Sequence, residues 1–471
     1  MTERPKRTTF KARLDEMIEV LTNDIMTGKY QEGDLLPSEI SLGEQFQLSK
    51  KSVRKALDTL VDEGYIEKLP RIGARVRSAN PGNRVIVKFG YYPSLVQEAN
   101  LMSLIDAFRK RYPQISVQMI PLPAGQASPT MRESMERESI DLITVNTQNY
   151  ELFLDEGSHP ESLEPLEPSD GIYPFLTKPF TADGTLYVQP FVFSPIVLCY
   201  NRRHFEEAGV PEPDSGWSWR DVRLASEALS RGNDRLGVLF NLLSTNRWPL
   251  FLLQNDYTFR TDEAGRTVYR DAKLRECLES CRGFADDSSI SLFLTEEEVS
   301  ERLFVREKAS MIVTSYFHMN ALRESGLDFD ISPLPYSKEA RTLLLVIGLA
   351  LNKNSAAKQA ARTLMEFLLS PESQLAIRKH TLSIPSVRSA AEYRPRKETR
   401  PLRYSMYRDI IPTFRYHGDL GLPFRSLIRL NNELLLYWTK MEDADEILRR
   451  AEEADSSLRA DPNLEEPAAG R

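Results

Sequence analysis

Apolar residues in the N-terminal part of the chain recur at intervals of three and four positions, the spacing of helices that bury one face. The pattern predicts a first helix over 10–26. Ser38 is a favourable N-cap for a short second helix that reaches Phe46, because a serine side chain accepts a hydrogen bond from an unpaired backbone N–H of the first turn. Ser49 is placed to cap a third helix in the same way, and Gly64 is placed to end it.

A basic hairpin is predicted directly after the third helix. Strands are expected at 65–69 and 74–77, around a turn at 70–73. Three short helices and such a hairpin form a winged helix-turn-helix, in which the third helix enters the major groove of DNA and the wing lies on the backbone. The first two turns of the third helix carry four positive charges before Asp58. The predicted DNA-contacting residues are Ser38, Ser49, Lys50, Lys51, Ser52, Arg54, Lys55, Arg71, Gly73 and Arg75.

Ordered motifs in this region resemble the DNA-binding domain of the GntR family of bacterial transcription regulators. They are the segments Gly33–Glu39, Leu48–Leu57 and Arg71–Val76. The resemblance implies binding of double-stranded operator DNA, and a two-fold related operator implies a homodimer. The chain departs from the family pattern at Ile40 and at Lys50–Lys51, where arginine and an Arg-Thr pair are usual. Phosphate contact survives these changes better than base readout, because lysine lacks the fork that pairs bidentately with guanine.

A small polar segment with a proline and a glycine, 78–84, has the composition of a domain boundary. Beyond it, strand-like and helix-like segments alternate, which predicts a largely parallel α/β sheet. The remainder is too long for one hydrophobic core, so two lobes are expected. Strands are expected at 85–90, 115–120, 141–145 and, interrupted by Pro190 and Pro195, at 186–201; helices are expected at 95–112, 219–231 and 358–369.

The expected organisation therefore has four parts. Residues 1–77 form the winged helix-turn-helix, 78–84 the linker and 85–455 a two-lobed α/β sensing domain. The last segment, 456–471, is polar and acidic and is expected to be a disordered tail.

Composition and charge narrow the class of protein. The chain has 471 residues, 41% of them hydrophobic, and a net charge of -7, with 61 Lys and Arg against 68 Asp and Glu. It is an ordinary globular chain and not a polycation that coats nucleic acid, so any DNA contact must be local. The longest strongly apolar run, Leu343–Leu351, is too short to cross a bilayer, and no membrane partner is expected. Because Met1–Arg13 is basic and polar with no apolar stretch behind it, we expect no secretory signal and a cytoplasmic protein.

No metal, cofactor or enzymatic activity is predicted. The five histidines are scattered singly. Cys277 and Cys281 lie four positions apart on an expected helix without further metal ligands, so we expect both to pack in the core. The sequence contains no Gly-x-Ser-x-Gly, Gly-x-x-x-x-Gly-Lys, Gly-x-Gly-x-x-Gly or His-Glu-x-x-His motif.

Segments spread over most of 85–450 resemble, in their order along the chain, the extracellular solute-binding proteins of family 1, the receptors that feed sugar transporters. The resemblance implies two α/β lobes joined by crossing segments, with the ligand held in a cleft that closes by a hinge motion. Because this chain joins such a unit to a DNA reader, the resemblance implies sensing and not transport. The segments are Asp141–Ile143, Gly184–Pro190, Tyr200–Gly209, Ser218–Asp221, Ala309–Met311, Ile347–Ala350 and Ile384–Pro385.

A sugar ligand presents an apolar C–H face that stacks on aromatic rings and an edge of hydroxyls that needs polar partners. Trp248 resembles the stacking tryptophan of some maltodextrin receptors, although packing in the core is an equal alternative; for Trp217 and Trp219 we expect packing. Asn146 and Gln148 follow an expected strand, and open α/β sheets bind ligands beyond the ends of their strands. The predicted ligand-contacting residues are Asn146, Gln148, Tyr150, Phe191, Phe193, Trp248, Tyr316 and Phe317.

Together these patterns predict a cytoplasmic transcription regulator that responds to a small solute, a sugar or oligosaccharide. Two alternatives stay open. The large domain is an aminotransferase-like sensor that holds pyridoxal phosphate on a lysine, or it only dimerises a DNA-binding protein. Operator affinity that depends on a solute distinguishes a sensor from a domain that only dimerises.

Overall fold

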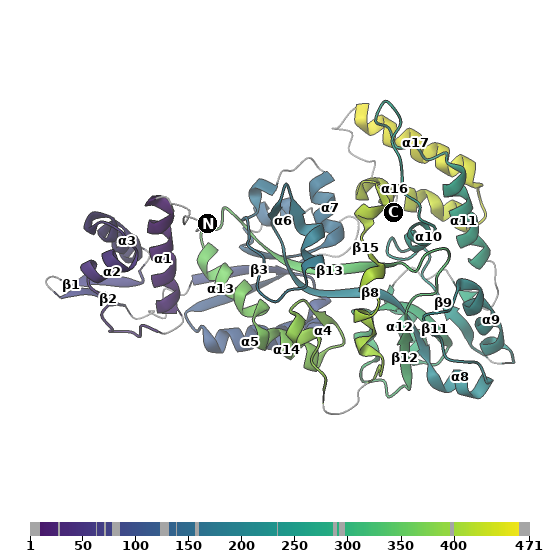
Figure 1. Ribbon diagram of the computed structural model, residues 1–471, viewed down its shortest axis with the longest axis horizontal. Coiled ribbons are helices and arrows are strands. Elements are labelled where there is room, and N and C mark those ends of the chain that lie inside the picture. Colours follow the sequence, from purple (N-terminus) through teal and green to yellow (C-terminus); the bar gives the residue numbers. More distant parts are fainter. Residues whose placement is uncertain are drawn as a thin grey trace, which may run out of the picture.

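Two units of unequal size make up the molecule (Figure 1). The small N-terminal unit lies beside the large unit, on the side where β3 (Val85–Tyr91) and α13 (Lys358–Leu369) are found. The computed structural model describes residues 10–26, 29–62, 64–69, 72–77, 85–122, 131–137, 139–155, 160–232, 234–285, 290–291, 297–395 and 400–460.

The small unit confirms the predicted three helices and hairpin. Ser38 caps the second helix, since its hydroxyl oxygen accepts from the backbone N–H of Ser41 at 3.2 Å. The hydroxyl oxygen of Ser49 likewise accepts from the N–H of Ser52 at 3.3 Å. The elements are α1 (Phe10–Met26), α2 (Glu39–Gln45), α3 (Lys50–Asp62) and the antiparallel strands β1 (Ile66–Leu69) and β2 (Gly73–Val76).

A mixed sheet runs through the large unit in the order β10-β9-β11-β8-β13-β5-β3-β4. Strands at both ends of this order are parallel to their neighbours, whereas β8 and β13 in the middle are antiparallel to each other and to the next strand of the order on either side, β11 and β5. The prediction of a largely parallel sheet is therefore wrong at the centre, because two long strands cross between the lobes in opposite directions. The strands are β4 (Ile115–Pro121), β5 (Leu142–Asn146), β8 (Gln189–Asn201), β9 (Leu236–Leu239), β10 (Ile290–Ser291), β11 (Ala309–Ser315) and β13 (Thr342–Leu351).

β8 is continuous, although its two prolines predicted interruptions. Pro190 lies opposite Gly348, where the register between β8 and β13 shifts, so its missing N–H falls at an irregular position of the ladder. The two backbones approach closely here, since a Cβ on Gly348 would lie 2.6 Å from the carbonyl oxygen of Gln189. The residues before β8 do not extend it: Thr185–Leu186 (β7) forms a separate hairpin with Thr181–Ala182 (β6).

The helix predicted over 95–112 is in fact two helices, α4 (Leu95–Glu98) and α5 (Leu101–Arg111). Asn100 between them has a φ of +52°, a left-handed conformation that asparagine tolerates better than most residues. Apolar side chains on both sides of the break enter the same core. Periodicity alone therefore did not locate the break.

The large unit has two hydrophobic cores. The first-lobe core packs around β3, β4 and β5 and continues over one face of β9 and β11, where it includes Leu239 and Ile312. The second-lobe core packs on the other face of β9 and β11, where it includes Val238 and Met311. Cys277 and Cys281 pack in the second-lobe core, as predicted, and so does Trp219, whose ring stacks on Phe251 at a centroid distance of 5.1 Å. Helices α5, α13 and α14 (Pro371–His380) cover the first lobe; α9 (Trp219–Ser230), α10 (Pro249–Gln254) and α11 (Ala272–Ala285) cover the second.

Two C-terminal helices, α16 (Phe424–Trp438) and α17 (Ala444–Ala460), pack against each other on the second lobe (Figure 1). Because α17 extends to Ala460, the helix continues past the predicted start of the tail at 456; residues 461–471 lie outside the described residues. α16 also packs against α7 (Thr147–Asp155) of the first lobe, so the two lobes are in contact at this point.

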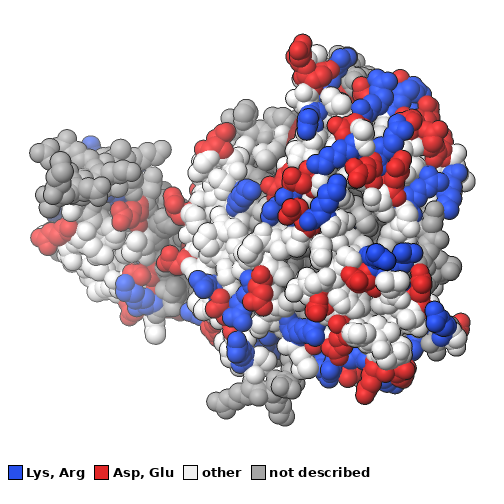
Figure 2. All heavy atoms as spheres, turned by 45° about the vertical axis from the view of Figure 1, so that its right-hand side comes forward, with Lys and Arg blue, Asp and Glu red and all other residues white. Residues whose placement is uncertain are grey.

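Charges of both signs are interspersed over the face of the large unit seen in Figure 2. On α17, for example, Arg449 pairs with Glu446 at 2.6 Å and with Glu453 at 2.6 Å. Such a surface does not attract a polyanion as a patch of one sign does. The small unit is therefore the place to look for contact with DNA.

Candidate functional site

The third helix of the small unit presents a basic face. Its apolar residues Val53 and Ala56 are buried against α1 and α2, which turns Lys50, Lys51 and Lys55 outward into solvent. Among the described residues, no carboxylate forms an ion pair with these three lysines. They are therefore available to phosphate groups of a DNA backbone.

Two of the predicted DNA-contacting arginines, one on α3 and one on β2, are held by neighbouring carboxylates. Arg54 Nε donates to both carboxylate oxygens of Glu39, at 3.1 and 2.9 Å, and Arg75 is bonded to Glu67 of the adjacent strand. A guanidinium tied in this way has fewer free N–H groups for a guanine edge.

The remaining predicted DNA-contacting residues occupy different environments. Ser38 and Ser49 are exposed, whereas Ser52 is buried with its hydroxyl 2.7 Å from that of Ser49. Gly73 begins β2 at the wing with a φ of +135°, and Arg71 lies outside the described residues. The DNA contacts of the whole set stay a prediction.

Polar side chains gather at the edge of the first lobe where β3 and β5 end. The hydroxyl of Tyr92 accepts from Asn149 Nδ2 at 2.7 Å and from the backbone N–H of Asn146 at 3.3 Å. The side-chain oxygen of Asn146 accepts in turn from the N–H of Asn149 at 2.7 Å. Burial raises the pKa of Tyr92 to about 12, so its hydroxyl keeps its proton at neutral pH.

The same edge touches the second lobe through Gln148. Its Nε2 donates to Asn246 Oδ1 at 2.7 Å and lies 3.3 Å from Thr245 Oγ1, both in the segment that follows β9. His417 Nε2 lies 3.0 Å from the carbonyl oxygen of Thr245. Burial lowers the pKa of His417 to about 4, so the ring is neutral and this nitrogen carries the proton that it donates. We call Gln148, Thr245 and Asn246 the lobe junction.

Carboxylates on α7 make a second contact between the lobes. Asp155 Oδ2 accepts from the backbone N–H of Arg425, at the start of α16, at 3.1 Å. Glu151 lies against Gly418 of the second lobe, and burial there raises the pKa of Glu151 to about 8. A backbone N–H of Gly418 opposes this shift, while Asp155 and Asp419 add to it. Glu151 is therefore largely protonated at neutral pH.

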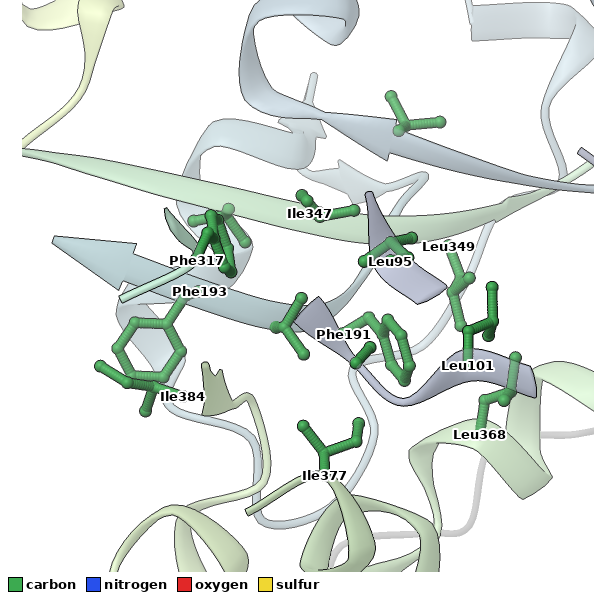
Figure 3. Close-up of a cluster of buried hydrophobic side chains, with 14 of the residues drawn as sticks. Leu95, Leu101, Phe191, Phe193, Phe317, Ile347, Leu349, Leu368, Ile377 and Ile384 are labelled. Atoms are coloured by element: carbon green, nitrogen blue, oxygen red, sulfur yellow. The ribbon is translucent and has the colours of Figure 1, made fainter. Parts of the chain in front are cut away.

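The predicted aromatic ligand contacts are all buried, and the structure divides them between the two cores. Figure 3 shows Phe191, Phe193 and Phe317 among aliphatic side chains of the first-lobe core. Trp248 is in the second-lobe core, where its Nε1 donates to Asn431 Oδ1 at 2.7 Å. Tyr150 and Tyr316 also lie in the first-lobe core.

The structure thus places Asn146 beside Tyr92 and Asn149, and Gln148 against Thr245 and Asn246, whereas the aromatic residues of the set are buried in the two cores. A ligand role for all eight residues stays a prediction. Sequence reasoning missed Thr245, Asn246 and Arg247, although they directly precede the conspicuous Trp248. Their position after a short strand, which no sequence pattern predicted, was the missing information.

Comparison with protein families accounts for both units. The family model of bacterial extracellular solute-binding proteins matches residues 103–401, and the model of gntR-family bacterial regulatory proteins matches residues 14–76. The chain belongs to the bacterial extracellular solute-binding protein family. Its N-terminal unit is a GntR-family helix-turn-helix.

Curated relatives match one unit each. An uncharacterized HTH-type transcriptional regulator, YieP of Escherichia coli, is 47% identical over 60 residues, which are 13% of this chain and 26% of that regulator. The sn-glycerol-3-phosphate-binding periplasmic protein UgpB of Brucella abortus is 26% identical over 172 residues, 35% of this chain and 39% of that protein. The chain therefore spans less than half the length of each of these relatives.

Solved structures of solute-binding proteins share the fold of the large unit. Maltose-bound MalE3 of T. maritima has a TM-score of 0.67 at 16% identity, covering 79% of this chain and 100% of that chain. A substrate-binding protein of Listeria monocytogenes in complex with cycloalternan has a TM-score of 0.66 at 16% identity, covering 80% and 99%. At this identity the likeness shows the two-lobed fold.

Two further properties of this solute-binding family member concern metals and membranes. In the part of the chain that the structure describes, His, Cys, Asp and Glu side chains do not gather in groups of three or more that would hold a metal ion. Within the same residues, no helix combines the length and the apolar character that crossing a membrane requires.

Proposed function

We propose that this protein is a transcription regulator that binds operator DNA through its GntR-type unit and responds to a small solute held between the lobes of its solute-binding unit. The observation that carries the proposal is the joining of the two family matches, at 14–76 and 103–401, in one chain. A DNA reader works where the DNA is, so we place the protein in the cytoplasm. We further propose that it acts as a homodimer on a two-fold related operator.

The exposed lysines of α3 support DNA binding. Lys50, Lys51 and Lys55 carry charge without an ion-pair partner among the described residues, at the helix that enters the groove in this motif. Because Arg54 and Arg75 are held by carboxylates, we expect affinity to come mainly from phosphate contacts, and sequence preference to be modest.

The side chains at the lobe junction support a polyhydroxylated solute. Gln148, Thr245 and Asn246, with Asn146 and Tyr92 beside them, offer amide and hydroxyl groups that both donate and accept hydrogen bonds. Several proteins with this fold are named for bound sugars, and the curated relative of the large unit is named for sn-glycerol 3-phosphate. We propose a sugar or a related polyol as the solute.

Tyr65 supports coupling between the two units. Its side chain packs against the core of the small unit and also against the first-lobe core. A change in the first lobe that accompanies closure therefore has a direct route to the base of the wing. If closed lobes place the two winged helices differently, solute and operator affinities change reciprocally.

The proposal is tested with the full-length protein in two steps. Duplexes enriched from a random pool by the purified protein supply an operator, whose binding is followed by fluorescence anisotropy at several salt concentrations. A thermal-shift screen against mono- and oligosaccharides, polyols and their phosphates then finds solutes, because a bound solute stabilises the native state. A protein that enriches no duplex, or that no solute in the screen stabilises, contradicts the proposal.

A large domain that only dimerises the small unit is the second candidate, and the contact between α7 and α16, in which protein groups hold the lobes together, is compatible with it. In that case operator binding is cooperative in protein concentration and unaffected by every solute that stabilises the protein. The same two measurements therefore separate the candidates.

A further inference from the structure

One arginine beside the lobe junction is buried, and no counter-charge pairs with it among the residues that the structure describes. Arg247 follows Asn246 directly and is 2% exposed. Its Nε donates to the carbonyl oxygen of Val313 on β11 at 3.3 Å, and its Nη1 donates to the carbonyl oxygen of Asn246 at 3.4 Å. The guanidinium therefore lies where the carboxyl-terminal ends of β9 and β11 meet, the edge at which open α/β sheets bind ligands.

Among the described residues, the hydrogen-bond partners of Arg247 are two neutral carbonyl oxygens. A guanidinium has five N–H groups, and the two bonds above use one on Nε and one on Nη1. Among the described residues, no carboxylate oxygen lies within the 4.0 Å of an ion pair with Arg247. A buried charge without a partner destabilises a fold, so such a group is kept where another molecule supplies the partner.

Other poorly exposed arginines in this chain are compensated. Arg235, Arg429 and Arg341, with side chains 13, 15 and 19% exposed, each lie within 4.0 Å of a carboxylate. Arg378 is 7% exposed and lies 3.5 Å above the ring of Tyr404, an aromatic partner for its charge. Arg247 has neither kind of partner among the described residues. The difference sets it apart from the structural arginines of the same chain.

We propose that Arg247 binds an anionic group of the solute, so that the ligand is a phosphorylated or carboxylated polyol and not a neutral sugar. The inference rests on the proposed function and specifies the charge of the solute. The amides of Asn246 and Gln148 face each other one residue away and would serve the hydroxyls, while the planar fork of the guanidinium matches a phosphate or a carboxylate bidentately.

The test compares matched neutral and anionic probes on the full-length protein. Glycerol against glycerol 3-phosphate, and glucose against glucose 6-phosphate and glucuronate, are titrated by calorimetry. We expect the anionic member of a pair to bind about 10- to 150-fold more tightly than the neutral one, the range for hydrogen bonds to a charged group. The phosphate and the carboxylate arms show which anion is preferred. Equal or tighter binding of the neutral members overturns the inference and leaves the proposed function standing, whereas a panel in which no member binds overturns both.

Variants of Arg247 separate a ligand role from a structural one. Arg247→Met removes an unpaired buried charge, so we expect it to abolish the preference for anions while the melting temperature without solute stays the same or rises. Arg247→Lys keeps the charge but loses the fork, and is expected to bind anions more weakly than the parent protein. Arg235→Lys, in which the paired arginine of the same lobe is changed, is the matched control and should keep the preference. A Met variant that melts far lower, together with a Lys variant whose anion preference is unchanged, assigns Arg247 to structure and overturns the inference.

Discussion

The amide of Gln148 in the first lobe donates to the amide oxygen of Asn246 in the second lobe at 2.7 Å. The two residues are 98 positions apart in the chain, and their contact joins the two lobes. A solute between the lobes must compete for these same amide groups. The bond therefore makes the contact between the lobes depend on whether a solute occupies the site.

Removing this bond should loosen the second-lobe side of the lobe junction. We expect Gln148→Ala to speed amide hydrogen exchange in 241–248 by about fivefold, because a neutral hydrogen bond contributes about 1 kcal/mol. Gln97→Ala, a change at an exposed glutamine of α4, is the control and should leave that segment unaltered. Exchange that is equally slow in both variants would show that the bond does not hold the lobes together.

The raised pKa of Glu151 predicts how the stability of the protein depends on pH. Its pKa is raised from 4.5 to about 8 in the folded protein because it is buried, so between these values the folded state holds a proton that the unfolded state has lost. The contribution of the protonated Glu151 to the free energy of unfolding is fully present below pH 4.5 and is lost as the pH rises toward 8. Glu151→Gln keeps the neutral form at every pH, so the variant should gain roughly 2 kcal/mol on the parent protein between pH 5 and pH 8.

The comparison requires unfolding curves of both proteins at several pH values. Glu206→Gln, at an exposed position of the second lobe (on α8, Arg202–Ala208), is the matched control and should follow the parent protein throughout. If the free energies of unfolding of Glu151→Gln and the parent protein differ by the same amount at every pH, the carboxyl group is already ionised in the folded state.

The lysines of α3 should set the salt dependence of DNA binding. Each phosphate contact contributes about 0.9 to the slope of log K against log salt, so Lys50→Ala and Lys51→Ala are each expected to lower the slope by about one. Arg54→Ala should lower it less, because Glu39 already holds that guanidinium. Anisotropy titrations between 50 and 200 mM salt measure the slopes. Lys110→Ala, at an exposed lysine of the large unit, is the control; if the α3 variants keep the slope of this control, the DNA does not lie on α3.

Trp248 is expected to be a packing residue in view of its place in the second-lobe core. Trp248→Ala removes a buried indole and its hydrogen bond to Asn431, and should destabilise the protein by about 3 to 5 kcal/mol. Trp248→Phe keeps most of the side-chain volume and should lose less stability. Thermal unfolding measures both. A variant that melts normally but no longer binds the solute would instead establish the stacking role that the sequence predicted as an alternative.

Local patterns explain which parts of the fold were predictable. The three helices and the hairpin of the small unit follow from apolar spacing and serine caps, which act within a few residues. The break at Asn100 was missed because the apolar spacing continues across it. The antiparallel centre of the large sheet was missed for another reason, since strand direction depends on pairing between segments far apart in the chain.

The candidate site was predictable only on its first-lobe side. Asn146 and Gln148 follow a strand with a clear pattern, so their position at the end of β5 could be expected. Their partners Thr245 and Asn246 follow a four-residue strand, and nothing local indicates that the two segments meet. The ligand contacts of the aromatic residues stay a prediction, because a large ring is as useful to a core as to a binding site.

The central claim is that solute binding and operator binding are coupled in one chain. The most direct test measures the dissociation constant of the enriched operator duplex by anisotropy, with the full-length protein, in the absence and presence of a saturating solute that stabilises it. The account predicts a change of about 5- to 150-fold, with the same factor appearing in the affinity for solute when DNA is present. Operator affinity that is identical with and without each stabilising solute would contradict it.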